Sequence, residues 1–155
     1  MKLRRNYLLI PVSVILVWAI GSIFTSGGMD WYNQLVLPAG TPPGSVIWMV
    51  WTVIYSLAIV SLLIFWNKTK HDKHFIVIFG LFLMNGVLNA WWNWLFFTNH
   101  WLGISFVMMI VIWLLTFVKI LLLWHRNKRA SILLFPYPIW VAIAATFAYK
   151  IWMLN

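Results

Sequence analysis

Five long apolar runs take up most of this 155-residue chain and decide what it can fold into. The runs cover residues 7–25, 46–66, 75–97, 101–124 and 132–154. Each has the roughly 20 residues that an α-helix needs to cross a bilayer. Lipid offers no partner to an open strand edge, and the runs lack the alternation of barrel strands. The sequence therefore predicts an all-α membrane protein, a five-transmembrane-helix bundle, with one domain over residues 1–155 because no length remains for another.

The charges lie between the apolar runs. Only 8% of the residues are charged, yet the formal net charge is +9. Nine of the eleven basic residues fall in three segments: Lys2, Arg4 and Arg5; Lys68, Lys70 and Lys73; Arg126, Lys128 and Arg129. A nucleic-acid partner is not expected, since basic residues in alternate connections indicate membrane topology instead. They predict a multi-pass protein of the cell membrane with a cytoplasmic N-terminus, an external C-terminus and an external loop over residues 26–45.

Two features near span ends have other interpretations. The first apolar run follows a basic start, as in a cleaved signal peptide, but its length and Trp18 favour a retained span. Lys119 and Lys150 lie close enough to span ends for their long side chains to reach the interface. We therefore expect no ionisable group buried in mid-span, which argues against a proton-coupled pump.

Polar and aromatic residues recur at helical spacing in three of the spans. Residues three, four and seven apart share one face of a helix. The repeats are Asn85, Asn89 and Asn93 with Trp92 and Phe96; Trp48, Trp51, Thr52 and Tyr55; and Tyr137, Trp140, Ala144 and Ala148. One interpretation is helix packing and interfacial anchoring, which suits tryptophans near span ends such as Trp18 and Trp152. The other is an inward-facing pocket for a flat apolar ligand, which better suits Trp51, Trp92 and Trp140.

Residues for conventional catalysis are scarce. The two carboxylates, Asp30 and Asp72, lie in loops predicted on opposite sides of the membrane, so they cannot act as an acid–base pair. The chain has no Cys, and its four His do not form a metal-ligand pattern with a carboxylate or thiolate. The sequence predicts no metal site and no required cofactor.

Several blocks together resemble a known family. "WYNQLVLPAGTPPG", "WMVWTVIY", "LNAWWNWLFF" and "PYPIWVAIAATF" occur in the order and spacing of the TspO/MBR family of tryptophan-rich sensory proteins, whose animal members are translocator proteins or peripheral-type benzodiazepine receptors. The resemblance implies a five-helix bundle, a homodimer, and a pocket for porphyrins such as protoporphyrin IX and haem. It also implies that the first loop covers this pocket as a lid, stiffened by its three prolines.

The resemblance and the helical repeats select the same residues. Positions that match the family's ligand contacts are Tyr32, Trp51, Asn89, Trp92, Trp140 and Ala144, to which the repeats add Trp48, Tyr55 and Phe96. The chain departs from the family's usual residues at Leu37, Gly40, Met108 and Ala148–Tyr149.

Three functions follow as alternatives. The first is a tetrapyrrole-binding sensor or carrier. The second is a light-dependent porphyrin-degrading enzyme, in which the indoles of Trp51 and Trp140 would be catalytic, as in similar bacterial proteins. The third is a transporter of small amphipathic solutes.

Overall fold

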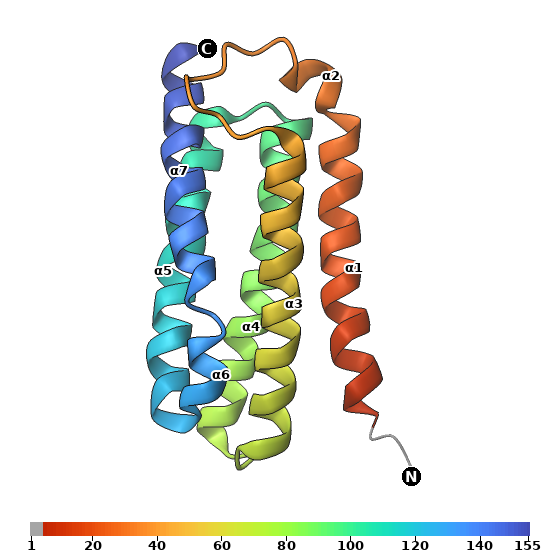
Figure 1. The fold of residues 1–155 in the computed structure, drawn as a ribbon, viewed down its shortest axis with the longest axis vertical. Helices are drawn as coiled ribbons and strands as arrows, with labels where there is room; N and C mark the ends of the chain where they lie inside the picture. Colours follow the sequence, from red (N-terminus) through yellow and green to blue (C-terminus); the bar gives the residue numbers. More distant parts are fainter. Residues whose placement is uncertain (1–4) are drawn as a thin grey trace.

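The helices of the chain stand side by side in one elongated bundle (Figure 1). The computed structural model describes residues 5–155, and this part of the chain contains no strand. The helices are α1 (Asn6–Gly27), α2 (Met29–Tyr32), α3 (Gly44–Lys68), α4 (Lys73–Asn93), the π-helix η1 (Trp94–Thr98), α5 (Leu102–Arg126), α6 (Lys128–Ile132) and α7 (Pro136–Leu154). Lys2 and Arg4, which contribute to the predicted topology, lie outside the described residues.

Five helical segments are long and apolar enough to cross a membrane. Large apolar side chains cover their outer surface: the exposed fractions of Leu8, Ile23 and Ile76 are 69%, 69% and 70%. Such a surface is costly in water but not against lipid tails, since only water drives apolar groups together. The predicted class, a five-helix multi-pass membrane bundle, is confirmed.

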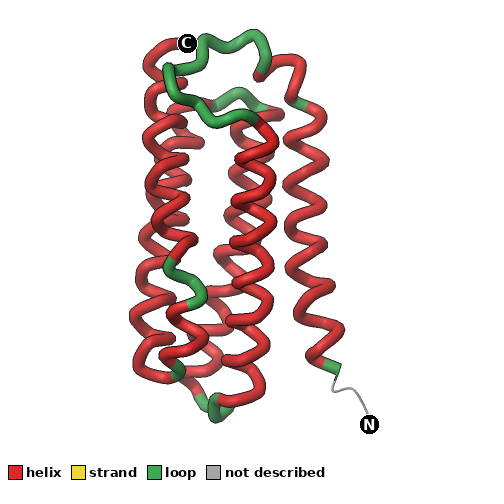
Figure 2. The backbone as a smooth tube through the Cα atoms, in the orientation of Figure 1, coloured by secondary structure: helices red, strands yellow, loops and turns green. Residues whose placement is uncertain are grey.

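Two predicted spans are not continuous α-helices. The third changes from α4 to the π-turn η1 at Trp94. The fifth is interrupted at residues 133–135 and divides into α6 and α7, visible as a loop within the bundle (Figure 2). Pro136 has no amide hydrogen to donate to the carbonyl four residues earlier, so the chain makes a tighter turn there, with Phe135 N donating to Ile132 O at 3.1 Å. Pro136 then becomes the first residue of α7, where a missing donor has no cost.

One end of the bundle is solidly packed. Its core cluster consists of Ile10, Leu62, Phe65, Phe75, Ile78, Ile120, Leu123, Ala130 and Leu134. A second cluster joins α3, α5 and α7 further along: Ile54, Met109, Ile112, Tyr137, Val141 and Ala145. The other end, under the long first loop, contains the cavity described below.

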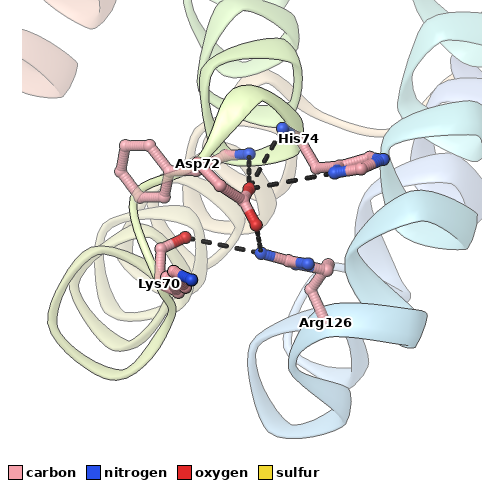
Figure 3. Close-up of polar contacts among 5 residues, drawn as sticks. Lys70, Asp72, His74 and Arg126 are labelled. Carbon is pink, nitrogen blue, oxygen red and sulfur yellow. Dashed lines mark hydrogen bonds and ion pairs between the residues drawn. The ribbon is translucent and has the colours of Figure 1, made fainter.

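Asp72 holds the turn between α3 and α4 (Figure 3). Its Oδ1 caps α4 by accepting from the backbone N–H of Phe75 at 3.0 Å and of His74 at 3.1 Å. Its Oδ2 accepts from Arg126 Nη2 at 2.6 Å, which ties this turn to the end of α5. The bond from Phe75, followed by the bond from Arg126, lowers the pKa of Asp72 to about 2. The carboxylate therefore stays charged well below neutral pH.

This carboxylate predicts a pH-dependent contribution to stability. The pKa of Asp72 is lower in the folded protein than the value of about 4 expected in the unfolded chain. The stabilisation is therefore fully present above about pH 4 and is lost as the pH falls toward about 2. Asp72→Asn keeps a capping side chain but removes the charge. In thermal melts followed by circular dichroism, the higher Tm of the wild type should converge on that of Asp72→Asn between pH 5 and pH 2; a difference independent of pH would contradict this role.

Candidate functional site: an aromatic cavity under the first loop

A cavity of about 210 Å³ lies inside the bundle beneath the first loop. A single water needs only about 10–15 Å³, so the space is far larger than a packing defect. All nine residues predicted to bind a ligand lie on its wall: Tyr32 from α2, Trp48, Trp51 and Tyr55 from α3, Asn89 and Trp92 from α4, Phe96 from η1, and Trp140 and Ala144 from α7. The structure thus brings them together, while their binding of a ligand stays a prediction.

The aromatic rings of the wall support one another. Trp51 stacks on Tyr55 with ring centroids 5.6 Å apart and meets the edge of Tyr137 at 6.0 Å. Trp92 stacks on Phe96 at 5.1 Å, and its Nε1 donates to Ser105 O at 3.0 Å. The rings are held before any ligand arrives, and this lowers the ordering cost of binding.

Helix α1 forms a wall that the sequence interpretation missed. Trp18, Gly21, Ser22 and Thr25 all line the cavity. Trp18 was expected to be an interfacial anchor near a span end; this was wrong, since it lies near the middle of α1 and meets Trp48 edge-on at 5.7 Å. The spacing of these four residues, at three, four and seven positions, is the signal that could have identified them. Thr52 is exposed and absent from the wall, although it was grouped with Trp48 and Tyr55.

The first loop crosses one end of the bundle, from α2 past the end of α7 to α3 (Figure 1), and it contributes to the cavity wall. Tyr32, Thr41 and Pro42 from this segment belong to the wall. Asn155 at the end of α7 holds the loop by two bonds: its Oδ1 accepts from Val36 N at 2.9 Å and its Nδ2 donates to Val36 O at 3.2 Å. Burial raises the pKa of the Tyr32 hydroxyl, so this group is neutral and can donate a hydrogen bond.

One side-chain contact and one backbone turn fix the shape of this lid. Trp31 stacks on His100, in the connection between η1 and α5, with centroids 3.9 Å apart. Gly40 has φ +83°, and Thr41 N donates to Pro38 O at 3.2 Å, which closes a tight turn. A positive φ at this turn position favours glycine. The departure from the family's usual residue at Gly40 therefore has a conformational reason.

The other residues that depart from the family's usual pattern lie in different parts of the bundle. Met108 packs against the second core cluster, and Ala148 lies on the cavity wall. Tyr149 faces outward beside Phe106, with centroids 5.3 Å apart. Leu37 is exposed, and nothing in the structure explains its departure.

The asparagine row of α4 points inward, as predicted. Asn85 and Asn89 are 4% and 6% exposed. Asn89 Nδ2 donates to the backbone carbonyl of Asn85 at 2.7 Å and to the hydroxyl of Tyr137. A carbonyl only accepts, so this contact fixes the orientation of the Asn89 amide. Both hydrogens of Nδ2 are used, which leaves Oδ1 as the acceptor that this side chain can offer at the cavity.

A buried lysine continues this polar row toward the packed end. Lys119 was expected to extend to the interface, and no ionisable group was expected inside a span; both expectations were wrong. Its side chain is 2% exposed, and Nζ donates to Asn85 Oδ1 at 3.2 Å. Asn85 Nδ2 in turn donates to Thr116 Oγ1 at 2.9 Å. A polar partner and aromatic faces inside the bundle hold the ammonium more favourably than the outer, lipid-facing surface of α5 would.

One polar group of the wall residues has no hydrogen-bond partner. Trp140 Nε1 is buried and has no hydrogen-bond partner within the part of the chain that the structure describes. A buried donor without a partner costs free energy, which a ligand acceptor can recover. Residues 5–155 contain no group of three or more His, Cys, Asp or Glu that could hold a metal ion.

Together, the five spans and the cavity define a multi-pass helical membrane protein with an aromatic pocket beneath an extramembrane loop. The model of the TspO/MBR family matches residues 8–153, and the chain belongs to this family. It is 31% identical to the tryptophan-rich protein TspO of Archaeoglobus fulgidus over 97% of this chain and 99% of that protein. It is 26% identical to protein CrtK of Rhodobacter capsulatus over 88% of this chain and 84% of that protein. It is 28% identical to the translocator protein of Homo sapiens over 88% of this chain and 82% of that protein.

Proposed function

We propose that this protein binds porphyrins, such as protoporphyrin IX and haem, and similar flat apolar ligands, and acts as a tetrapyrrole sensor or carrier. The observation that carries the proposal is the cavity, because nine residues selected from the sequence come from five helices to line one space inside the bundle. Indole and phenol rings suit a flat conjugated ligand, since stacking supplies affinity without many polar contacts.

The polar groups of the wall also fit such a ligand. Asn89 offers an amide oxygen, which suits the pyrrole N–H of a free-base porphyrin. Trp140 also lines the cavity, and its unsatisfied Nε1–H would meet a ring nitrogen or a carboxyl oxygen once the indole turned toward the ligand. A few polar groups among many aromatic ones would orient the ligand. Because most of the wall is aromatic, an apolar ligand would still move favourably from lipid into the cavity.

A titration tests this function. Protoporphyrin IX added to the purified protein should quench tryptophan fluorescence with a Kd below about 10 μM, or roughly −7 kcal/mol. Asn89→Leu removes one acceptor and should weaken binding about 3- to 10-fold. Asn67→Leu is the matched control, because Asn67 lies at the far end of α3, where its Nδ2 donates to Leu63 O at 2.8 Å. Absence of quenching in the wild type, or equal loss in both variants, would contradict the proposed pocket.

Porphyrin photo-oxidation is a second candidate, supported by the position of Trp51 and Trp140 on the same wall. An excited porphyrin in the cavity would lie close enough to accept an electron from either indole and to pass it to dissolved oxygen, which is the oxidant. The indole radical cation would then regain an electron from the porphyrin, which is thereby oxidised. The titrated samples, when illuminated, distinguish the two functions: a loss of porphyrin absorbance that disappears in Trp51→Phe with Trp140→Phe would support an enzyme rather than a carrier.

The same proposal includes a membrane orientation. Lys68, Lys70, Lys73, Arg126, Lys128 and Arg129 all lie at or next to the two connections at the packed end of the bundle. The connections at the cavity end contain no Lys or Arg. By the positive-inside rule, we propose that the protein lies in the cell membrane with its N-terminus in the cytoplasm and its lid on the external side. We also propose a homodimer, which rests on the family resemblance.

A further inference from the structure

Lys119 is a basic side chain enclosed in the bundle without a carboxylate partner. Its Nζ lies 3.2 Å from Asn85 Oδ1, 4.7 Å from the centroid of the Phe82 ring and 5.3 Å from that of Tyr137. The chain has only two acidic side chains. Asp30 lies in α2 within the lid, and Asp72 is bonded to Arg126 at the opposite end. The amide and the two rings stabilise the ammonium, but no side chain neutralises its charge.

The ammonium lies just behind the inner end of the cavity. Tyr137, over which Nζ sits, packs edge-on against the wall residue Trp51 and bonds to the wall residue Asn89. Asn85, which accepts from Nζ, is one helical turn from Asn89. One layer of side chains therefore separates the charge from the ligand space, and this layer contains no opposite charge.

A charge in this position has a long reach. In a protein and lipid interior, the field is screened far less than in water. At a separation of about 10 Å and an effective dielectric constant of about 20, opposite unit charges attract enough to change a binding constant about tenfold. The field of Lys119 therefore extends into the cavity and favours negative charge at its inner end.

We propose that Lys119 is the counter-charge for an anionic group of the ligand, so that the cavity selects carboxylate-bearing flat ligands over neutral ligands of the same shape. The inference rests on the proposed function and assigns its specificity to a residue outside the cavity wall. Lys119 acts through space and does not touch the ligand. Its contribution should therefore depend on charge, not on shape.

A matched pair of probes separates charge from shape. Protoporphyrin IX carries two carboxylates, and its dimethyl ester has the same ring with neither charge. Each is titrated into the full-length protein in neutral detergent micelles at pH 6, by tryptophan quenching. The wild type should bind the acid about tenfold more tightly than the ester. In Lys119→Met the two affinities should agree within about twofold, through weaker binding of the acid, while the affinity for the ester is unchanged.

Two further variants serve as controls. Lys119→Arg keeps the charge and should keep the preference for the acid. Lys150→Met removes an equal charge from an exposed position of α7 and should also keep it, which excludes an effect of net charge alone. A preference that persists at about tenfold in Lys119→Met would overturn the role of Lys119 and leave porphyrin binding intact. Failure of the wild type to bind either probe would instead overturn the proposed function, and this inference with it.

Discussion

Asn85→Leu is expected to reduce the free energy of unfolding by about 3 kcal/mol, the largest effect of any substitution considered for this bundle. The leucine fits the space of the amide, so little of the loss comes from packing. The loss comes from Lys119, whose Nζ would stay inside the bundle with its hydrogen-bond acceptor removed. Thr116 loses a donor as well, but its hydroxyl still bonds to Ile112 O at 2.8 Å.

A double-mutant cycle shows whether the lysine is responsible. Lys119→Met with Asn85→Leu removes both partners and leaves no buried charge, so it should recover most of the stability lost in Asn85→Leu. Unfolding titrations in mixed micelles with a denaturing detergent, followed by circular dichroism, give the four free energies. If the double variant is as unstable as Asn85→Leu, the buried ammonium is not the source of the loss, and the contact between the two residues is structural only.

Lys119 also shows where sequence reasoning reached its limit. The distance of a lysine from a span end is readable in the sequence and suggested that the side chain reaches the interface. The direction that the side chain takes depends on Asn85 and Phe82, which belong to another helix. No local pattern in α5 reports these neighbours. Two of the three residues that receive the ammonium, Asn85 and Tyr137, were nevertheless identified by their own helical repeats.

The cavity wall was predictable because helical periodicity fixes which residues share a face. The repeats in α3, α4 and α7 selected wall residues without any knowledge of how the helices pack. Trp18 was not predicted to line the cavity, because its distance from the span end was considered instead of its helical spacing from Thr25. The π-turn at Trp94 was not predicted for a different reason: its sequence is as apolar as that of the α-helix before it.

Gly28→Ala is expected to destabilise the protein by about 2–3 kcal/mol, although it adds one methyl group. Gly28 joins α1 to α2 and lies against η1. A Cβ at this position would collide with Phe97 O and would lie 2.7 Å from Phe97 Cβ and 2.9 Å from Phe97 C. The obstacle is mainly backbone, which cannot rotate away as the end of a side chain can. The α1–α2 junction must therefore move away from Phe97.

The neighbouring residue provides a matched control. A Cβ at Gly27 meets nothing within 4 Å, so Gly27→Ala should be neutral or stabilise α1 by up to about 1 kcal/mol. The same unfolding titrations compare the two variants. Phe97 lies on the cavity wall, and α2 places Tyr32 beside it with centroids 5.8 Å apart. Gly28→Ala should therefore also weaken porphyrin binding, whereas Gly27→Ala should not; equal behaviour of the two variants would mean that the lid is not seated on η1 through Gly28.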